Sequence, residues 1–558
     1  MLTNSSEEKV WVSDIISDDY MRWHEDVILL GFGTGRGKTT FALNTYCKYL
    51  IYMGQRVVYL CNRIKLKEQI IADAAKYGVG EIDIMSYQKM AESIRYGYEP
   101  NYDVYICDEA HFFLSDAEFN LYTDVAYDYI LKQQTSTRVY MTATYQNIFT
   151  QIKKDLEEQD EKFSEYYLPT DYSYVENIYW WKKKNDLYGI IDHLLTTTND
   201  KIIYFCNSLK KMREVYSHYS PNRGKAYLEE DKKFLKDSPL QYMSFVCSES
   251  YQKDDEESQD DNTKTKEKRV LLKDEEERED KNNFIRQYCS MEHLIKNPQT
   301  QGYTFDNRIL ITTKVLDNGL DFKDEEIKHI ILDVFDLESA IQCLGRKRIL
   351  NENDTCNFYI RDWQHNQLNL FLEPIKESLK SSIMFCTDNK KWIRKYGTNR
   401  EYKDNTIYFD FDMNEHRLNR LRYQKLLSDR QMINAMIGRR TSYRAEIMSH
   451  LGDIPCIDLE EVKAAHVRDA IEIWIEVHKE QYLSEDEKQE LISLCDLKDK
   501  YNRQQQSIGI ISHYLNDNYG YTVTNKQHRI DGKRVKEWVI THVQKENNSN
   551  PEKLPRPP

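Results

Sequence analysis

The sequence predicts an α/β protein with two tandem domains built on parallel sheets, followed by a mainly helical C-terminal region. Over the first 150 residues, short apolar runs such as Val27–Leu30 and Val57–Leu60 alternate with helix-like stretches. Apolar strands separated by helices are typical of parallel sheets that are covered on both faces. The alternation begins again near Tyr172, with strand-like runs such as Ile202–Phe205 and Ile309–Thr312, which predicts the second domain.

The remaining elements follow from the same pattern of apolar runs and stop signals. Further strands are predicted at Ile82–Met85, Val104–Cys107, Arg138–Met141, Gln241–Val246 and His329–Leu332. Helices are predicted at Thr39–Tyr52, Ile64–Tyr77, Leu418–Ile437, Asp458–Gln481 and Ser507–Tyr519. Two strand-like runs flank Asp531-Gly532, a dipeptide that strongly favours a β-hairpin. The chain is therefore expected to end in a helix and a hairpin.

These elements predict a domain organisation along the chain. The segment Lys253–Lys281 carries 13 acidic and 8 basic residues with few large apolar ones, which predicts a disordered acidic insertion at about 252–282. The predicted segments are a first α/β domain at 1–170, a second at 171–365 that contains this insertion, a helical accessory region at 366–500, a helix with a basic hairpin at 501–546, and a disordered tail at 547–558.

The composition indicates a soluble, cytoplasmic protein with several cores. Of the 558 residues, 40% are hydrophobic, yet the apolar runs are far shorter than the ~18 residues of a membrane span, and Met1–Val10 is too polar for a signal peptide. The net charge of −14 excludes the broad basic field of a nonspecific nucleic-acid coat, but a local basic groove is compatible with it. The 11 cysteines include no CxxC pair, which is typical of reduced thiols rather than of zinc or disulfides.

A glycine-rich segment, Gly31–Thr40, directly follows the first predicted strand and opens a helix. Strand, loop and helix in this order form the setting of a phosphate-binding loop, in which backbone N–H groups and a helix N-terminus converge on phosphate oxygens. Lys38 can reach the terminal phosphates, and the Thr39 hydroxyl can bind Mg²⁺. The segment departs from the strict pattern, because Phe32 replaces the first glycine. The predicted nucleotide-binding residues of this segment are Gly33, Thr34, Gly35, Arg36, Gly37, Lys38, Thr39 and Thr40.

An acidic motif, Asp108-Glu109-Ala110-His111, follows the strand predicted at Val104–Cys107. A carboxylate at the C-terminal end of a parallel strand faces the crevice where ligands of α/β proteins bind. Asp108 is expected to hold Mg²⁺, and Glu109 to orient or deprotonate an attacking water, as phosphoryl transfer requires. The spacing of about 70 residues from the phosphate loop strengthens the prediction, since four such residues alone recur by chance.

Taken in order, these motifs resemble those of superfamily 2 helicases of the DEAH/DExH kind, over about residues 25 to 365. The resemblance implies two RecA-like domains and the cofactors ATP and Mg²⁺. It implies that His111, Thr142 and Thr144 couple the nucleotide state to the grip on nucleic acid. The segment from Thr312 to Asp321 is similar to the fifth motif of the family, which adds Gly319 and Asp321 to the predicted nucleotide site.

The sixth motif of the family resembles Gln342 to Arg348, and it implies catalytic roles for Gln342, Arg346 and Arg348. An arginine placed at the γ-phosphate stabilises the charge of the transferring phosphoryl group, commonly by a factor of about 10³ to 10⁵. The motif departs from the family pattern, because Cys343 replaces an arginine and Ile349 stands where the usual arginine finger would be. This shorter form is more similar to origin-binding-type helicases of large DNA viruses and mobile elements. Either Arg346 or Arg348 could be the arginine finger, and the sequence does not decide between them.

Candidate nucleic-acid contacts come from two sources. The resemblance implies that Arg63, Asn207, Thr312 and Thr313 face the nucleic acid. Independently, the stretch from Tyr501 to Lys545 carries seven Lys or Arg residues against three acids, and its helix and hairpin suggest a winged-helix-like contact through Lys533 and Arg534. An ordinary surface hairpin is an equal alternative. Trp180-Trp181 can be read as a base-stacking platform, but packing is favoured.

The sequence therefore predicts an ATP-hydrolysing helicase or translocase with nucleic acid as its partner, with DNA favoured over RNA and no membrane. A protein partner could bind the C-terminal region. Two alternatives stay open: a nucleotide-gated binding module that barely hydrolyses ATP, and a motor subunit of a larger replication or defence complex. The acidic motif favours 3′-to-5′ movement by analogy alone.

Overall fold

The computed structural model describes residues 10–220, 239–247, 284–285, 288–300, 302–313, 320–397, 406–410, 413–499, 501, 503–530 and 533–543. The chain divides into two compact units, Met1–Cys456 and Ile457–Pro558. The predicted acidic insertion at about 252–282 and the predicted tail at 547–558 lie outside the described residues. The other domain boundaries stay predictions; the division between the units falls within the predicted accessory region.

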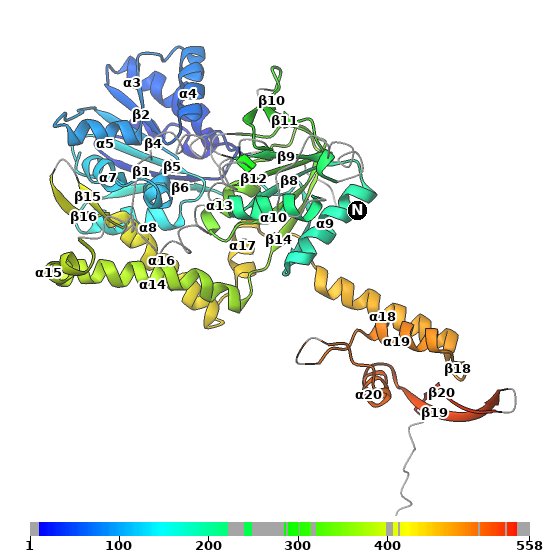
Figure 1. Ribbon diagram of the computed structural model, residues 1–558. Coiled ribbons are helices and arrows are strands. Elements are labelled where there is room, and N and C mark those ends of the chain that lie inside the picture. The colour runs from blue at the N-terminus through cyan, green and yellow to red at the C-terminus, as the bar shows by residue number, and fades with distance from the viewer. Residues whose placement is uncertain are drawn as a thin grey trace, which may run out of the picture. The chain divides into compact units, whose positions relative to one another are not determined.

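The first unit begins with a six-stranded parallel sheet, the first lobe (Figure 1). Its spatial order is β3-β2-β4-β5-β1-β6, so β5 separates β1 from β4. Successive side chains of each strand enter different cores: Ile28 and Leu30 of β1 pack on one face of the sheet, and Val27 and Leu29 on the other. The strands are β1 (Val27–Phe32), β2 (Val57–Cys61), β3 (Asp83–Ser86), β4 (Val104–Asp108), β5 (Thr137–Thr142) and β6 (Phe163–Leu168).

Helices cover both faces of this sheet, as the predicted alternation requires. The predicted helix at Thr39–Tyr52 is present from Lys38, with a π-helical segment in its middle. The elements are α1 (Val12–Ile16), η1 (Asp19–Arg22), α2 (Lys38–Thr40), η2 (Phe41–Cys47), α3 (Lys48–Tyr52), α4 (Ile64–Tyr77), α5 (Tyr87–Arg95), α6 (Phe112–Ser115), η3 (Asp116–Glu118), α7 (Thr123–Leu131) and α8 (Gln146–Glu157).

The second lobe is built on another parallel sheet, in which β7-β14-β13-β8-β12-β9 are neighbours in that order. The strands are β7 (Val175–Trp181), β8 (Lys201–Cys206), β9 (Met243–Val246), β12 (Ile309–Thr313), β13 (Ile327–Asp333) and β14 (Cys356–Arg361). The other elements are α9 (Lys184–Thr197), α10 (Leu209–Tyr219), η6 (Pro239–Tyr242), η7 (Met291–His293), the small hairpin β10 (Leu294–Lys296) and β11 (Tyr303–Phe305), α13 (Leu337–Leu344) and α17 (Tyr443–Leu451). The predicted class of two RecA-like α/β domains is confirmed.

Five described strands of the lobes were not predicted: β6, β7 and β14 of the two large sheets, and the small hairpin β10–β11. The strand expected at Gln241–Val246 begins only at Met243, because a 3₁₀ turn occupies Pro239–Tyr242. Trp180 and Trp181 belong to β7 and are fully buried, so they pack in the interior and do not form a base-stacking platform. None of the described helices is long and apolar enough to cross a membrane.

After the second lobe, the chain returns to the first and connects the two. The helix α16 (Arg420–Ile437) packs beside the long helix α14 (His365–Thr387) (Figure 1). At its start, Arg420 forms an ion pair with Asp155 of the first lobe, with 3.1 Å between nitrogen and oxygen. Further along, Lys425 pairs with Asp336 of the second lobe at 3.0 Å, and Ile433 is buried in that lobe's core. Between α14 and α16 in the chain are α15 (Asn389–Trp392), η9 (Ile393–Gly397), β15 (Ile407–Asp410) and β16 (Glu415–Leu418).

The second unit has its own small core. The helices α18 (Leu459–His478), α19 (Glu485–Cys495) and α20 (Ile508–Tyr519) pack with an antiparallel sheet in the order β18-β20-β19. The predicted helix and hairpin are confirmed: the long strands are β19 (Tyr521–Ile530) and β20 (Lys533–His542), and β18 (Tyr482–Leu483) is short. The turn residues Asp531-Gly532 lie outside the described residues. The strand β17 (Cys456–Asp458) stands at the boundary of the two units.

A buried carboxyl between the lobes makes the stability of the first unit depend on pH. Glu338 of α13 accepts a hydrogen bond from the Asn147 amide of α8 at 2.9 Å, and burial raises its pKa from 4.5 to about 7. The folded state therefore keeps a proton that the unfolded chain releases between these two values. The stabilisation from this difference is fully present below pH 4.5 and is lost as the pH rises through about 7.

Replacing this carboxyl by an amide removes the titration. Glu338→Gln is expected to raise the unfolding midpoint, relative to the original chain, more at pH 8 than at pH 5. Thermal unfolding followed by circular dichroism at both pH values measures this difference. Glu377→Gln, at an exposed position of α14, serves as the control and should change the midpoint equally at both. An equal effect of Glu338→Gln at both values would contradict the assignment.

Candidate active site

The phosphate loop connects β1 to α2 and packs against the segment that follows β6. Gly35 and Gly37 have φ angles of 72° and 86°, which residues with a side chain rarely adopt. The Gly33 N–H donates to the Leu168 carbonyl at 2.7 Å, and a Cβ on Gly33 would lie 2.2 Å from the nitrogen of Thr170. Glycine is therefore required at positions 35 and 37 for the backbone of the turn, and at position 33 for close packing.

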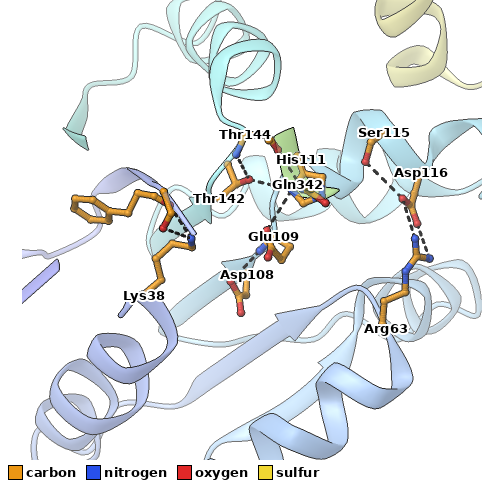
Figure 2. A network of polar contacts seen from close by, with 12 residues as sticks. Lys38, Arg63, Asp108, Glu109, His111, Ser115, Asp116, Thr142, Thr144 and Gln342 are labelled. Atoms are coloured by element: carbon orange, nitrogen blue, oxygen red, sulfur yellow. Dashed lines mark hydrogen bonds and ion pairs between the residues drawn. The ribbon is translucent and has the colours of Figure 1, made fainter. Parts of the chain in front are cut away.

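Lys38, the first residue of α2, is folded back over its own loop. Its Nζ donates to the carbonyl oxygens of Phe32 at 2.7 Å and Gly33 at 3.2 Å. Burial lowers the pKa of Lys38, while the nearby carboxylates of Glu109 and Asp108 act against this shift (Figure 2). A phosphate would give the ammonium a charged partner in place of two carbonyl dipoles, and charge-assisted hydrogen bonds are the stronger kind.

The predicted acidic motif lies at the C-terminal end of β4, beside Lys38. Asp108 accepts hydrogen bonds on both oxygens: Oδ2 from the Tyr59 hydroxyl at 2.7 Å and Oδ1 from the Glu109 N–H at 3.0 Å. Burial, together with the charge of Glu109, raises the pKa of Asp108 to about 6. Glu109 has a φ of 51°, a left-handed conformation that costs a non-glycine residue on the order of 1–3 kcal/mol. Such strain is typical of functional positions.

A hydrogen-bonded network links the acidic motif to the second lobe (Figure 2). His111 contacts Thr142 of β5, with 2.9 Å between Nδ1 and Oγ1, and lies 3.4 Å from Glu109 Oε2. Gln342 of α13, in the second lobe, places its Nε2 2.7 Å from His111 Nε2 and 3.3 Å from Thr144 Oγ1. Because burial lowers the pKa of His111, its ring is neutral and can accept this hydrogen bond. The three predicted coupling residues thus meet a residue of the other lobe.

The arginines of the second lobe face the phosphate loop. Arg348 forms an ion pair with Asp321, with 2.9 Å between Nη2 and Oδ1, and donates to the Gly345 carbonyl at 2.6 Å. Its Nη1 would lie 3.4 Å from a Cβ on Gly35, and both residues line the same small pocket, so the guanidinium lies beside the loop. Arg346 is buried, and its Nη1 lies 3.8 Å from the same Asp321 oxygen. Both guanidinium groups lower the pKa of Lys38, with Arg348 exerting the larger effect.

A second contact between the lobes lies beside this one. A Cβ on Gly345 would lie 2.6 Å from Thr34 Oγ1, so only glycine fits where the arginine segment meets the loop. The two segments enclose a small pocket that Asp171 and Tyr174 also line. Arg36 of the loop donates to the Pro169 carbonyl at 3.0 Å. The structure therefore brings the phosphate loop, the acidic motif and the arginine segment together at one place.

The predicted nucleic-acid contacts are more dispersed. Arg63 forms an ion pair with Asp116, at 2.8 Å, and Asn207 is exposed at the end of β8. Thr312 and Thr313 are buried in β12, where the Thr312 hydroxyl donates to the Thr313 carbonyl. Gly319 lies outside the described residues. Lys533 and Arg534 are exposed on β20 of the second unit, as are the neighbouring Arg529 and Lys536 on the same hairpin.

Comparison with known proteins does not assign the chain to a family. No protein-family model and no curated protein matches the chain. Solved structures similar to it include S. cerevisiae Dbp5 bound to RNA and ADP BeF3, with 13% identity and a TM-score of 0.37 over 62% of this chain and 81% of that one. A variant of Dbp5 in the same complex has 14% sequence identity and a TM-score of 0.38, again over 62% of this chain and 81% of that one. A deletion form of Mss116p bound to ssRNA and AMP-PNP has 13% sequence identity and a TM-score of 0.39, over 79% of this chain and 90% of that one.

The donors present fit a magnesium ion bound together with a nucleotide. The Thr39 hydroxyl and the Asp108 carboxylate supply the oxygen ligands that Mg²⁺ prefers. Oε2 of Glu109 is buried without a hydrogen-bond partner, which leaves it able to bind a water. Among the described residues, no group of three or more His, Cys, Asp or Glu side chains could hold a metal ion by itself. Phosphate oxygens and water would therefore complete the coordination.

Sequence reasoning missed two residues that contact the acidic motif. Tyr59 of β2 donates to the Asp108 carboxylate, and Tyr87 of α5 donates to the Asp108 carbonyl at 2.8 Å. Both rings are fully buried among apolar residues. A tyrosine in an apolar strand gives no local signal of its partner. Only the order of strands in the sheet, which places β2 next to β4, could have indicated this contact.

Proposed function

We propose that this chain is a nucleic-acid-dependent ATPase of the helicase type, which hydrolyses ATP to ADP and phosphate between its two RecA-like lobes. The observation that carries the proposal is the position of Arg348, which belongs to the second lobe and lies beside Gly35 in the phosphate loop of the first. A site assembled from both lobes makes phosphate chemistry depend on how the lobes are placed. Domain movement can then follow each round of hydrolysis.

The loop and Lys38 would bind the phosphates. The N–H groups at the start of α2 converge with its positive helix end, and Lys38 exchanges the Phe32 and Gly33 carbonyls for phosphate oxygens. Thr39 and Asp108 are the residues that would hold Mg²⁺, which supplies charge neutralisation at the transferring phosphoryl group when bound.

We assign the orientation of the attacking water to Glu109. Although burial opposes ionisation, the nearby cations Lys38, Arg346 and Arg348 lower the pKa of this carboxyl below its usual range. Glu109 is therefore ionised at neutral pH and can orient a water by accepting its proton in a hydrogen bond. We assign the arginine finger to Arg348, because it lines the small pocket together with Gly35 of the loop. The hydrogen bond from Gln342 to His111 joins this chemistry to the second lobe.

The finer assignment follows from the motif residues. The acidic motif with His111 favours the DEAH kind of superfamily 2 helicase, and the short arginine segment ending at Arg348 favours the origin-binding type. The exposed basic residues of β20 support a nucleic-acid contact in the second unit. These residues do not distinguish DNA from RNA, so both belong in the test.

Steady-state ATP hydrolysis with single-stranded DNA, duplex DNA and RNA is the direct test. Turnover of the original chain is expected to rise with at least one of these, and Lys38→Ala is expected to abolish it. Lys48→Ala, which removes an exposed lysine of the following helix, is the matched control and should retain full turnover. A hydrolysis rate that is unchanged by every nucleic acid would contradict the helicase proposal and would be consistent only with an ATPase. Binding without hydrolysis would favour the nucleotide-gated module.

The two arginines are expected to differ in their kinetic effect. Arg348→Ala should lower kcat by about 10³-fold or more with little change in KM, because a finger acts mainly in the transition state. Arg348→Lys should not restore the rate, since an ammonium lacks the planar fork of a guanidinium. Arg346→Ala should lower kcat less. A larger loss from Arg346→Ala than from Arg348→Ala would reverse the assignment.

The hairpin of the second unit is expected to contact phosphates. Replacing Lys533 and Arg534 with glutamine should weaken nucleic-acid binding and reduce the salt slope by about one for each phosphate that is no longer neutralised, because fewer counterions are released. Fluorescence anisotropy across a series of salt concentrations measures the slope. The control removes two exposed lysines of α14 in the same way, Lys376 and Lys380. An unchanged slope in the hairpin variant would remove the hairpin from the interface.

A further inference from the structure

We infer that Tyr59 positions the predicted magnesium ligand Asp108, and so sets the Mg²⁺ requirement of nucleotide binding. The inference rests on the proposed function, because it concerns the same nucleotide site. Tyr59 lies in the middle of β2, and Asp108 ends the neighbouring strand β4. Its role would be indirect, since its ring is fully buried.

The first support is a direct hydrogen bond between Tyr59 and the side chain of the ligand. The Tyr59 hydroxyl donates to Asp108 Oδ2 at 2.7 Å. Both side chains are buried, so this hydrogen bond is shielded from water. The position of a carboxylate oxygen at the end of β4 is thereby fixed from the neighbouring strand β2.

The second support is that this contact completes the orientation of the carboxylate. Asp108 Oδ1 accepts the N–H of Glu109 at 3.0 Å, so Tyr59 holds the remaining oxygen. With both oxygens held, the carboxylate plane has one orientation. Partners that orient metal-binding side chains commonly change metal affinity by about 10- to 100-fold when they are removed. Loss of the Tyr59 hydroxyl should therefore weaken Mg²⁺ more than it weakens the nucleotide.

The neighbouring Tyr87 gives the inference a matched control. Its hydroxyl also donates to Asp108, but to the main-chain carbonyl, at 2.8 Å. Its ring is equally buried in the same lobe. Tyr59→Phe and Tyr87→Phe each remove one oxygen atom next to Asp108 and keep the ring that packs. Only the first change frees the carboxylate.

The experiment is equilibrium binding of a fluorescent, non-hydrolysable ATP analogue to the full chain, followed by anisotropy while Mg²⁺ is titrated. For Tyr59→Phe, the Mg²⁺ concentration at half-maximal binding is expected to rise about 10-fold or more. Affinity for the analogue in EDTA should stay within about twofold of the original chain, and the unfolding midpoint should show that the variant is folded. Tyr87→Phe should titrate like the original chain.

The outcomes separate this inference from the proposed function. A Tyr59→Phe titration that coincides with that of the original chain overturns the inference, and so does an equal shift in Tyr87→Phe, which would mean a general packing effect. Binding by the original chain that is independent of Mg²⁺ also overturns it, while nucleotide binding stands. If the original chain binds no analogue under any condition, the proposed function itself fails.

Discussion

The approach of the Arg348 guanidinium to the phosphate loop is the interaction on which the rest of the site depends. It brings Arg348 and Arg346 close enough to lower the pKa of Lys38, while both arginines form ion pairs with Asp321. Burial raises the pKa of Asp321, but the charges of Arg348 and, to a smaller extent, Arg346 lower it below its usual range. The cluster is therefore electrostatically prepared for an anion, because a phosphate would relieve the repulsion among the three cations.

Two connections keep this contact in place. The first is the hydrogen bond from Gln342 to His111, which joins α13 of the second lobe to the acidic motif of the first. The second is α16, which is anchored by Arg420 on the first lobe and by Ile433 in the core of the second. A helix fixed at both ends restricts how far the lobes can separate. Changes in the cleft are therefore expected to be small rearrangements rather than a wide opening.

The sequence predicted the parts of the site that depend on local patterns. The phosphate loop and the acidic motif each follow a predicted strand, so their positions at the C-terminal ends of β1 and β4 could be expected. The RecA-like class followed from the alternation of strands and helices. The strand β7 was missed because the polar Glu176 and Asn177 interrupt its apolar run, although Trp180 and Trp181 at its end are buried in the interior.

What the sequence could not predict depends on contacts between distant segments. The hydroxyl of Tyr59 meets Asp108 only because β2 and β4 are neighbours in the sheet. The role of α16 as a link between lobes needs the positions of both cores, since its own sequence shows only a helix. The choice between Arg346 and Arg348 likewise required the position of Gly35, which lies far away in the chain.

A crystal structure of the chain with ADP and beryllium fluoride, in the presence of Mg²⁺, tests the central claim most directly. The account predicts that the Lys38 ammonium leaves the Phe32 and Gly33 carbonyls and that an Arg348 nitrogen lies at hydrogen-bond distance, about 3 Å, from the fluoride group. A complex in which Arg348 keeps only its contacts with Asp321 and Gly345, while the nucleotide fills the loop without it, would contradict a site shared between the two lobes.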